Sequence, residues 1–297
     1  MSKDKLKILI IPVVVIIIFA VIIINPDVEY EPEYSVEKFI SCNLFDMKDF
    51  MSSVSDAKEI NTTGKNLKGG VTNHHLLADY MISSFYKTVK KNPPDIIILI
   101  GPNHKRIGKS KIHTGRYSWA TSFGTLETEE SIVQRLIMEL GADENLEILE
   151  KEHAIYTHIP YIKYYIPTAK VVPIILHGNM SIKESKELAR ELFEAVKGKN
   201  YFVAGSIDFS HYLSVEEADM MDEITIQAIK DKDINRISFM GNDNIDSPAS
   251  MIVILEMMRL EGSENMIVAD HNNSAKISNS SFDYTTSYFE LFFYKDS

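Results

Sequence analysis

Three short runs of apolar, mostly β-branched residues constrain the fold of this chain most strongly. They span residues 95–100, 170–176 and 201–205, and their composition is typical of strands buried on both faces. Segments with the periodicity of amphipathic helices separate or follow these runs, at 76–90, 129–140, 182–196 and 215–230. This alternation predicts an α/β sandwich built on a mixed or parallel sheet, with functional residues in the loops at the strand ends.

Two patterns near the C-terminus extend this prediction. Ser247-Pro248 is typical of an N-cap followed by proline at the first helical position, and it predicts a helix over 249–260. The segment 284–293 predicts a last strand. We find no internal repeat, low-complexity tract or long linker after residue 34, so we expect residues 35–297 to form a single domain.

An apolar run of 17 residues, 8–24, predicts a transmembrane signal-anchor helix. A cleaved signal peptide and a buried core segment are the alternatives, but no small-residue cleavage site follows the run. The lysines within residues 1–7 place that end in the cytoplasm and the main domain outside it. Residues 25–34, rich in proline and glutamate, then form a short stalk.

Cysteine content, charge and missing motifs exclude several classes. Cys42 is the single cysteine, so the chain has no intrachain disulfide, cysteine-rich zinc site or iron–sulfur cluster. The formal charge of −11 comes without a basic patch, which argues against a nucleic-acid partner. Nucleotide-binding glycine loops and the serine-hydrolase elbow are absent from the sequence, which argues against those activities.

Several of the nine histidines fall where a predicted strand gives way to a loop or helix. His104 follows Gly101-Pro102, which break the first strand and turn the imidazole out at its tip. Asp208 and His211 follow the third strand, and their three-residue offset allows both to face one side of a tight turn. The remaining groups are His74-His75 before a helix, Glu152-His153, and His158.

A single histidine at a strand end is more often a hydrogen-bonded structural residue than a metal ligand. Four such groups at the strand ends favour one shared site. Neutral imidazoles together with one or two carboxylates suit a divalent transition metal, such as iron, copper or zinc.

The order of these motifs resembles that of the Memo family, also called AmmeMemoRadiSam system protein B. The resemblance extends over roughly residues 69–294 and implies a fold similar to that of class III extradiol dioxygenases. The matching segments are Asn73-His74-His75, Gly101-Pro102-Asn103-His104, Trp119–Leu126, Glu152–Pro160, Val172-Pro173-Ile174 and Ser206–Tyr212.

The resemblance implies that His74 and His104 are metal ligands. The family has cysteine as its third ligand, whereas this chain has the segment 242–248 in that region. The related dioxygenases use a carboxylate there, so Asp246 is the expected third ligand, with Asp243 as the fallback. The alternative is that Asp246 and Ser247 only cap the following helix. Such a two-histidine, one-carboxylate site favours iron or copper over zinc.

The resemblance also implies catalytic residues. Asp208 is expected to orient His211, which then donates or accepts a proton. His153, together with Glu152, is expected to orient the substrate or support the metal ligands. Trp119 and residues 121–126 are expected to line or support the pocket.

Together, these expectations predict a membrane-anchored, metal-dependent oxidoreductase that acts on a small molecule or peptide. The resemblance adds AMMECR1-like and radical-SAM proteins as candidate partners, although an extracytoplasmic domain would be separated from a cytoplasmic radical-SAM protein. A non-enzymatic metal- or peptide-binding module and a metal-dependent hydrolase are the alternatives, because fold alone does not fix function.

Overall fold

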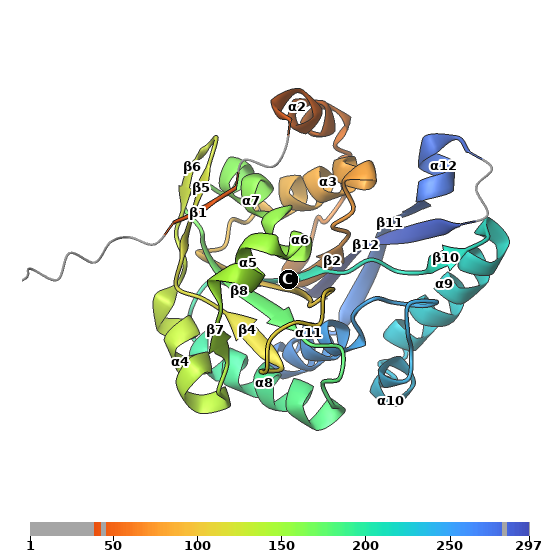
Figure 1. Cartoon of the computed structure of the whole chain (residues 1–297). Helices are drawn as coiled ribbons and strands as arrows, with labels where there is room; N and C mark the ends of the chain where they lie inside the picture. The colour runs from red at the N-terminus through yellow and green to blue at the C-terminus, as the bar shows by residue number, and fades with distance from the viewer. Residues whose placement is uncertain (1–38, 43–45, 281–283, 297) are drawn as a thin grey trace, which may run out of the picture. The chain divides into compact units, whose positions relative to one another are not determined.

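A sheet of nine strands organises the part of the chain that the computed structural model describes, residues 39–42, 46–280 and 284–296 (Figure 1). The strands follow the order β10-β12-β2-β9-β3-β8-β4-β7, and β11 also pairs with β12. Their bounds are β2 Lys65–Thr72, β3 Ile96–Pro102, β4 Ile112–Thr114, β7 Asp143–Glu144, β8 Lys170–Leu176, β9 Tyr201–Ser206, β10 His211–Leu213, β11 Asn265–Asn273 and β12 Thr285–Asp296.

The centre of this sheet is parallel and its flanks are antiparallel. Strands β2, β9, β3 and β8 run parallel, whereas β12 pairs antiparallel with β2, and β4 pairs antiparallel with β8. The three apolar runs of the sequence are β3, β8 and β9, which confirms the prediction of a mixed sheet. The parallel strands end at one edge of the sheet, where an α/β fold places its functional loops.

Helices cover both faces of the sheet (Figure 1). Side chains alternate along β3, so Ile96, Ile98 and Ile100 pack into one core while Ile97 and Leu99 pack into the other. Helices α4, α8, α9 and α11 contribute to the first core, and α3 and α7 contribute to the second. The helix bounds are α2 Met47–Asp56, η1 Leu76–Ala78, α3 Asp79–Val89, α4 Glu130–Leu140, α5 Leu146–Lys151, α6 His153–Tyr156, α7 Ile159–Tyr165, α8 Ile182–Ala195, α9 Val215–Lys230, α10 Ile234–Ser238, α11 Pro248–Glu261 and α12 Ser274–Ser278.

Four of the five predicted helices, α4, α8, α9 and α11, begin within one residue of the predicted start, whereas the sequence did not predict α2, α5, α6, α7, α10 and α12. Ser247 caps α11 by accepting a hydrogen bond from the Ser250 backbone, and Pro248 is the first helical residue. The segment predicted as one helix over 76–90 instead begins with the 3₁₀ turn η1, and α3 follows it.

A second, three-stranded sheet lies outside the main one. It has the order β1-β5-β6, with β1 at Phe39–Ser41, β5 at Ser118–Thr121 and β6 at Gly124–Leu126. Trp119 of β5 is fully buried in the core that also contains Leu126. The indole therefore contributes to packing.

The described residues belong to one compact unit, Lys38–Ser297. Across these residues we find no helix that is both long enough and apolar enough to cross a membrane. The predicted cytoplasmic segment 1–7, anchor 8–24 and stalk 25–34 lie outside the described residues.

Candidate metal centre

Three neighbouring parallel strands bring the candidate residues together. His74 lies two residues beyond β2, His104 two residues beyond β3, and Asp208 two residues beyond β9. Because β9 lies between β2 and β3 in the sheet, the segments after these strands emerge side by side at one edge. Motifs that are far apart in the sequence therefore lie close together in space.

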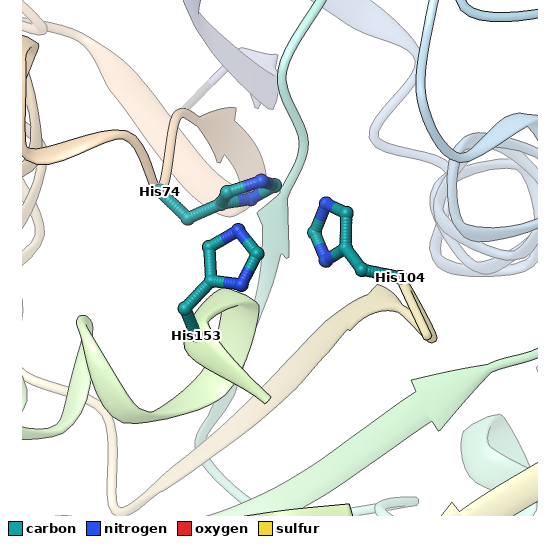
Figure 2. A group of neighbouring side chains, drawn as sticks. All are labelled: His74, His104 and His153. Carbon is teal, nitrogen blue, oxygen red and sulfur yellow. The ribbon is translucent and has the colours of Figure 1, made fainter. Parts of the chain in front are cut away.

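Three imidazoles face one another at this edge (Figure 2). One ring nitrogen from each of His74, His104 and His153 lies within 4.8 Å of the other two. The His104 and His153 rings stack with centroids 4.1 Å apart, and His74 meets both rings edge-on with centroids 4.9 Å away. His153 enters from α6, so a third segment of the chain reaches the two strand-end histidines.

Asp246 places a carboxylate between the two predicted histidine ligands. Its Oδ2 lies 3.4 Å from Nε2 of His74 and 3.6 Å from Nε2 of His104. Ligand atoms about 2.1 Å from an ion in tetrahedral geometry are separated by roughly 3.4 Å, so these spacings suit a shared metal ion. The other carboxylate oxygen of Asp246 is buried and lacks a hydrogen-bond partner within the described chain.

The alternative role of Asp246 as a helix cap is not needed, because Ser247 supplies the side-chain cap of α11. The Asp246 carboxylate instead accepts a hydrogen bond from the backbone of Asp208, at 3.3 Å. Asp243, the fallback ligand, has an exposed side chain. The local geometry therefore favours Asp246 over Asp243.

Asp208 contacts His74. Its Oδ1 accepts from the His74 backbone N–H at 3.1 Å, and its Oδ2 lies 3.5 Å from His74 Nε2. Burial, and then the neighbouring charge of Asp246, raise the pKa of Asp208 well above its ordinary value. A bound cation would offset the repulsion between these two carboxylates.

His211 does not pair with Asp208 as expected, since no hydrogen bond between their side chains is found among the described residues. The His211 backbone instead donates to the Asn242 carbonyl as β10 begins, while Asp208 turns toward His74. The His211 side chain lines the cavity above the imidazoles, and its buried Nδ1 lacks a partner in the described chain.

Glu152 holds His104 in place. Its carboxylate accepts from His104 Nδ1 at 2.7 Å and from the His104 backbone at 3.0 Å. Because Nδ1 donates to Glu152, a metal would bind at Nε2, which faces Asp246, and would displace the proton that Nε2 carries in the charged ring. The sequence contains Glu152 in a matching motif, but its pairing with His104 depends on how α6 packs against β3.

The three imidazoles differ in their affinity for protons. Burial, followed by the neighbouring His104 and His153 rings, lowers the pKa of His74 far below its ordinary value. Burial and the nearby His104 also lower the pKa of His153. Burial lowers the pKa of His104 too, but its contacts with Asp246 and Glu152 outweigh this effect and raise the pKa to about 10. Neutral His74 and His153 suit metal ligation, which requires an unprotonated nitrogen.

A cavity of about 440 Å³ opens above this cluster. Its wall contains His74, His104, His153 and Asp208, together with His211 and Tyr212 from the segment after β9. This volume is within the range of small-molecule sites in proteins. The predicted metal-binding and catalytic residues thus surround one space, with Asp246 behind the imidazoles.

A second group with metal-ligand chemistry, Asp219, Asp222 and His271, was not predicted from the sequence. Asp222 is buried, accepts 2.6 Å hydrogen bonds from the hydroxyls of Ser210 and Ser287, and lies 2.8 Å from His271 Nε2. These contacts satisfy the carboxylate without an ion. The group therefore joins α9 to strands β11 and β12 as a polar contact within the fold.

Comparisons with known proteins confirm the resemblance to the Memo family. The family model described as Memo-like protein matches residues 49–291. A MEMO1 family protein of Pyrobaculum aerophilum is 26% identical over 244 residues, covering 78% of this chain and 85% of that protein. A MEMO1 family protein of Aquifex aeolicus is 26% identical over 186 residues, covering 61% of this chain and 69% of that protein.

A solved structure shares the fold at low sequence identity. The crystal structure of an uncharacterized protein from Escherichia coli K12 aligns with a TM-score of 0.50 and 12% identity. The alignment covers 76% of this chain and 99% of that protein. This similarity concerns the fold alone.

Proposed function

This chain belongs to the family of Memo-like proteins, and from that premise we propose that it is a metal-dependent oxidoreductase related to extradiol dioxygenases. The observation that carries the proposal is the Asp246 carboxylate oxygen, 3.4 Å and 3.6 Å from the Nε2 atoms of His74 and His104. Two imidazoles and one carboxylate that leave other positions open are the ligand set of non-haem iron oxygenases. His153 is the candidate for an additional ligand.

The donor set fits a divalent transition metal. The partnerless oxygen of Asp246, the crowding of Asp246 with Asp208, and the low proton affinity of His74 and His153 all favour a bound cation. A redox-active metal such as iron or copper would supply Lewis acidity and electron transfer there. The same residues can also bind zinc, as a metal-dependent hydrolase would require. A hydrolase would keep its activity without oxygen, and this distinguishes it from the proposed oxidoreductase.

The surrounding side chains orient the histidines and provide space for a substrate. Glu152 fixes the His104 ring, Asp208 fixes the His74 backbone, and the cavity admits a small molecule or the end of a peptide. The His211 side chain lines the same cavity, so its imidazole can exchange a proton with that molecule. We therefore assign His211 the proton-transfer role, and Asp208 a positioning role toward His74.

The proposal includes an N-terminal membrane anchor over residues 8–24 with the main domain outside the cytoplasm. Its support is the apolar run and the preceding lysines. AMMECR1-like and radical-SAM proteins remain candidate partners on the basis of the family resemblance. Protease protection of the full-length chain in membrane vesicles tests this orientation.

Metal content tests the proposal most directly. The full-length chain, purified without chelator, is expected to hold about one transition-metal ion. His74→Ala, His104→Ala and Asp246→Ala each remove a proposed ligand, so each is expected to lose most of that metal. Elemental analysis of each purified variant measures the loss and identifies the metal.

His177→Ala is the matched control, because it removes an imidazole outside this cluster. It should leave the metal content unchanged. Circular dichroism verifies that each variant is folded. If the folded wild-type chain takes up no metal even when supplemented, or if the three ligand variants retain it, the proposed centre is wrong.

A further inference from the structure

A second cavity, also about 440 Å³, adjoins the one above the histidines. Leu76, Tyr156 and Thr157 line both cavities, so a molecule at the candidate metal centre can extend past these residues into the second space. Neither the family match nor the motifs assign a role to this second cavity. The cavity lies where α2, η1, α3 and the α6–α7 region meet.

One part of the wall of this second cavity is apolar, and contacts among its own residues hold it in place. Phe50 packs against Tyr161 with ring centroids 4.6 Å apart, and the Tyr161 hydroxyl makes a 2.9 Å hydrogen bond with Ser53. Leu77 and Pro160 contribute further apolar surface. A wall held in this way is formed before a ligand arrives, which limits the entropy cost of binding.

Three carboxylates complete the lining, and among the described residues no basic side chain contributes to it. Asp46 caps α2, Asp49 lies in the first turn of α2, and Asp79 is the first residue of α3. In the described part of the chain none of the three forms an ion pair with lysine or arginine. Burial, opposed by a backbone hydrogen bond and assisted by Asp49 and Asp56, raises the pKa of Asp79 to about 6. The described wall of the cavity therefore carries three carboxylates without an ion-paired lysine or arginine.

We propose that this second cavity is a recognition subsite for an organic cation, an ammonium or guanidinium group carried on an apolar body. The apolar body would pack against Phe50 and Tyr161, and the cationic group would lie near Asp49 and Asp79. The reacting end of the same molecule would reach the histidine cavity past Leu76 and Tyr156. The inference rests on the proposed function for its reacting end, whereas the cation subsite stands on the cavity itself.

A matched pair of small probes tests the subsite. Phenethylamine and 3-phenylpropionate have similar size and opposite charge, and neither depends on a metal. In calorimetric titrations of the full-length chain at low ionic strength, phenethylamine should bind at least about tenfold more tightly. The double substitution Asp49→Asn/Asp79→Asn should weaken phenethylamine binding by about tenfold and remove the preference.

Two further variants serve as controls. Asp95→Asn makes the same chemical change at an exposed site just before β3, and it should leave binding unchanged. Leu77→Trp fills the cavity from a partly exposed position, so it should abolish probe binding in a folded protein. Equal affinity for the two probes, no measurable binding of phenethylamine, or undiminished binding to Leu77→Trp would overturn the inference.

Metal content separates this inference from the proposed function. The Asp49→Asn/Asp79→Asn chain should keep its metal while losing the probe preference, because neither residue contacts the histidine cluster. His74→Ala should lose the metal while keeping the preference. A metal-free wild-type chain that prefers phenethylamine would refute the metal centre alone, and a metal-bound chain without the preference would refute the subsite alone.

Discussion

His158 shows how burial controls the chemistry of a single residue in this protein. Its side chain is fully buried, and Nδ1 lies 3.0 Å from the Tyr86 hydroxyl. Burial lowers the pKa of His158 to about 3. The folded protein therefore keeps this imidazole neutral at pH values where the unfolded chain protonates it.

This difference predicts a pH-dependent stability. Below the ordinary histidine pKa of about 6.5, the unfolded state binds a proton that the folded state refuses, so stability falls as the pH falls and levels off near the folded pKa. Between about pH 7 and about pH 5, His158 should cost about 2 kcal/mol of unfolding free energy. His158→Gln should lack this contribution, as measured by urea denaturation at both pH values.

Tyr86→Phe is the matched control, because it removes the hydrogen-bond partner and keeps the imidazole. It should lower stability at both pH values without changing the difference between them. The account fails if His158→Gln keeps the full pH dependence of the wild type.

At the level of residues, much of the candidate site is predictable from the sequence. His74, His104, His153, Asp208, His211 and Asp246 were all selected, and the structure places them around or behind one cavity. The hydrogen-bond partners of these residues could not be predicted from the sequence. Asp208 contacts His74 where His211 was expected, and Glu152 braces His104, because these contacts depend on the packing of segments far apart in the chain.

At the scale of elements, the apolar strands were predictable and the polar ones were not. The runs now seen as β3, β8 and β9 are buried on both faces, so their composition alone identifies them. Strand β2, which leads to His74 at the sheet edge, has two lysines in its first half, followed by two adjacent glycines. Strand β11 is largely polar. Both strands form because they pair with β12. This pairing joins segments far apart in the chain, so the local sequence pattern does not predict it.

Gly70 explains why β2 departs from the usual strand composition. A Cβ atom there would lie 2.5 Å from the Leu291 carbonyl oxygen and 2.6 Å from the Phe85 ring. The missing side chain lets Phe85 of α3 pack closely on β2 and stack on Phe292 of β12, with centroids 5.1 Å apart. The glycine therefore allows helix α3 to pack closely against two strands of the sheet.

Gly70→Ala should destabilise the protein by about 1–3 kcal/mol, because the added methyl group forces the ring or the strand to move. Thermal unfolding compared with Gly178→Ala measures the effect, since an added Cβ at Gly178 meets no atom within 4 Å. Equal melting temperatures for the two variants would show that β2 can shift without cost.

At the scale of the whole molecule, the candidate metal centre joins segments that are distant in the sequence. His74 follows β2, His104 follows β3, and Asp246 precedes α11, so the site exists only when the sheet and its covering helices are assembled. The unfolded chain cannot present these atoms within 3.6 Å of one another. Metal binding should therefore favour the folded state over the unfolded state.

This coupling predicts that a chelator lowers the stability of the whole unit. At a free metal concentration about 100 times the dissociation constant, binding adds about 2.7 kcal/mol, or about 5 to 10 °C in melting temperature. Chelator should abolish the increase in the wild-type chain and have no effect on His74→Ala, as followed by scanning calorimetry. His177→Ala should respond as the wild type does, because its substituted imidazole lies outside the centre. An equal chelator effect on His74→Ala would place the stabilising ion elsewhere in the protein.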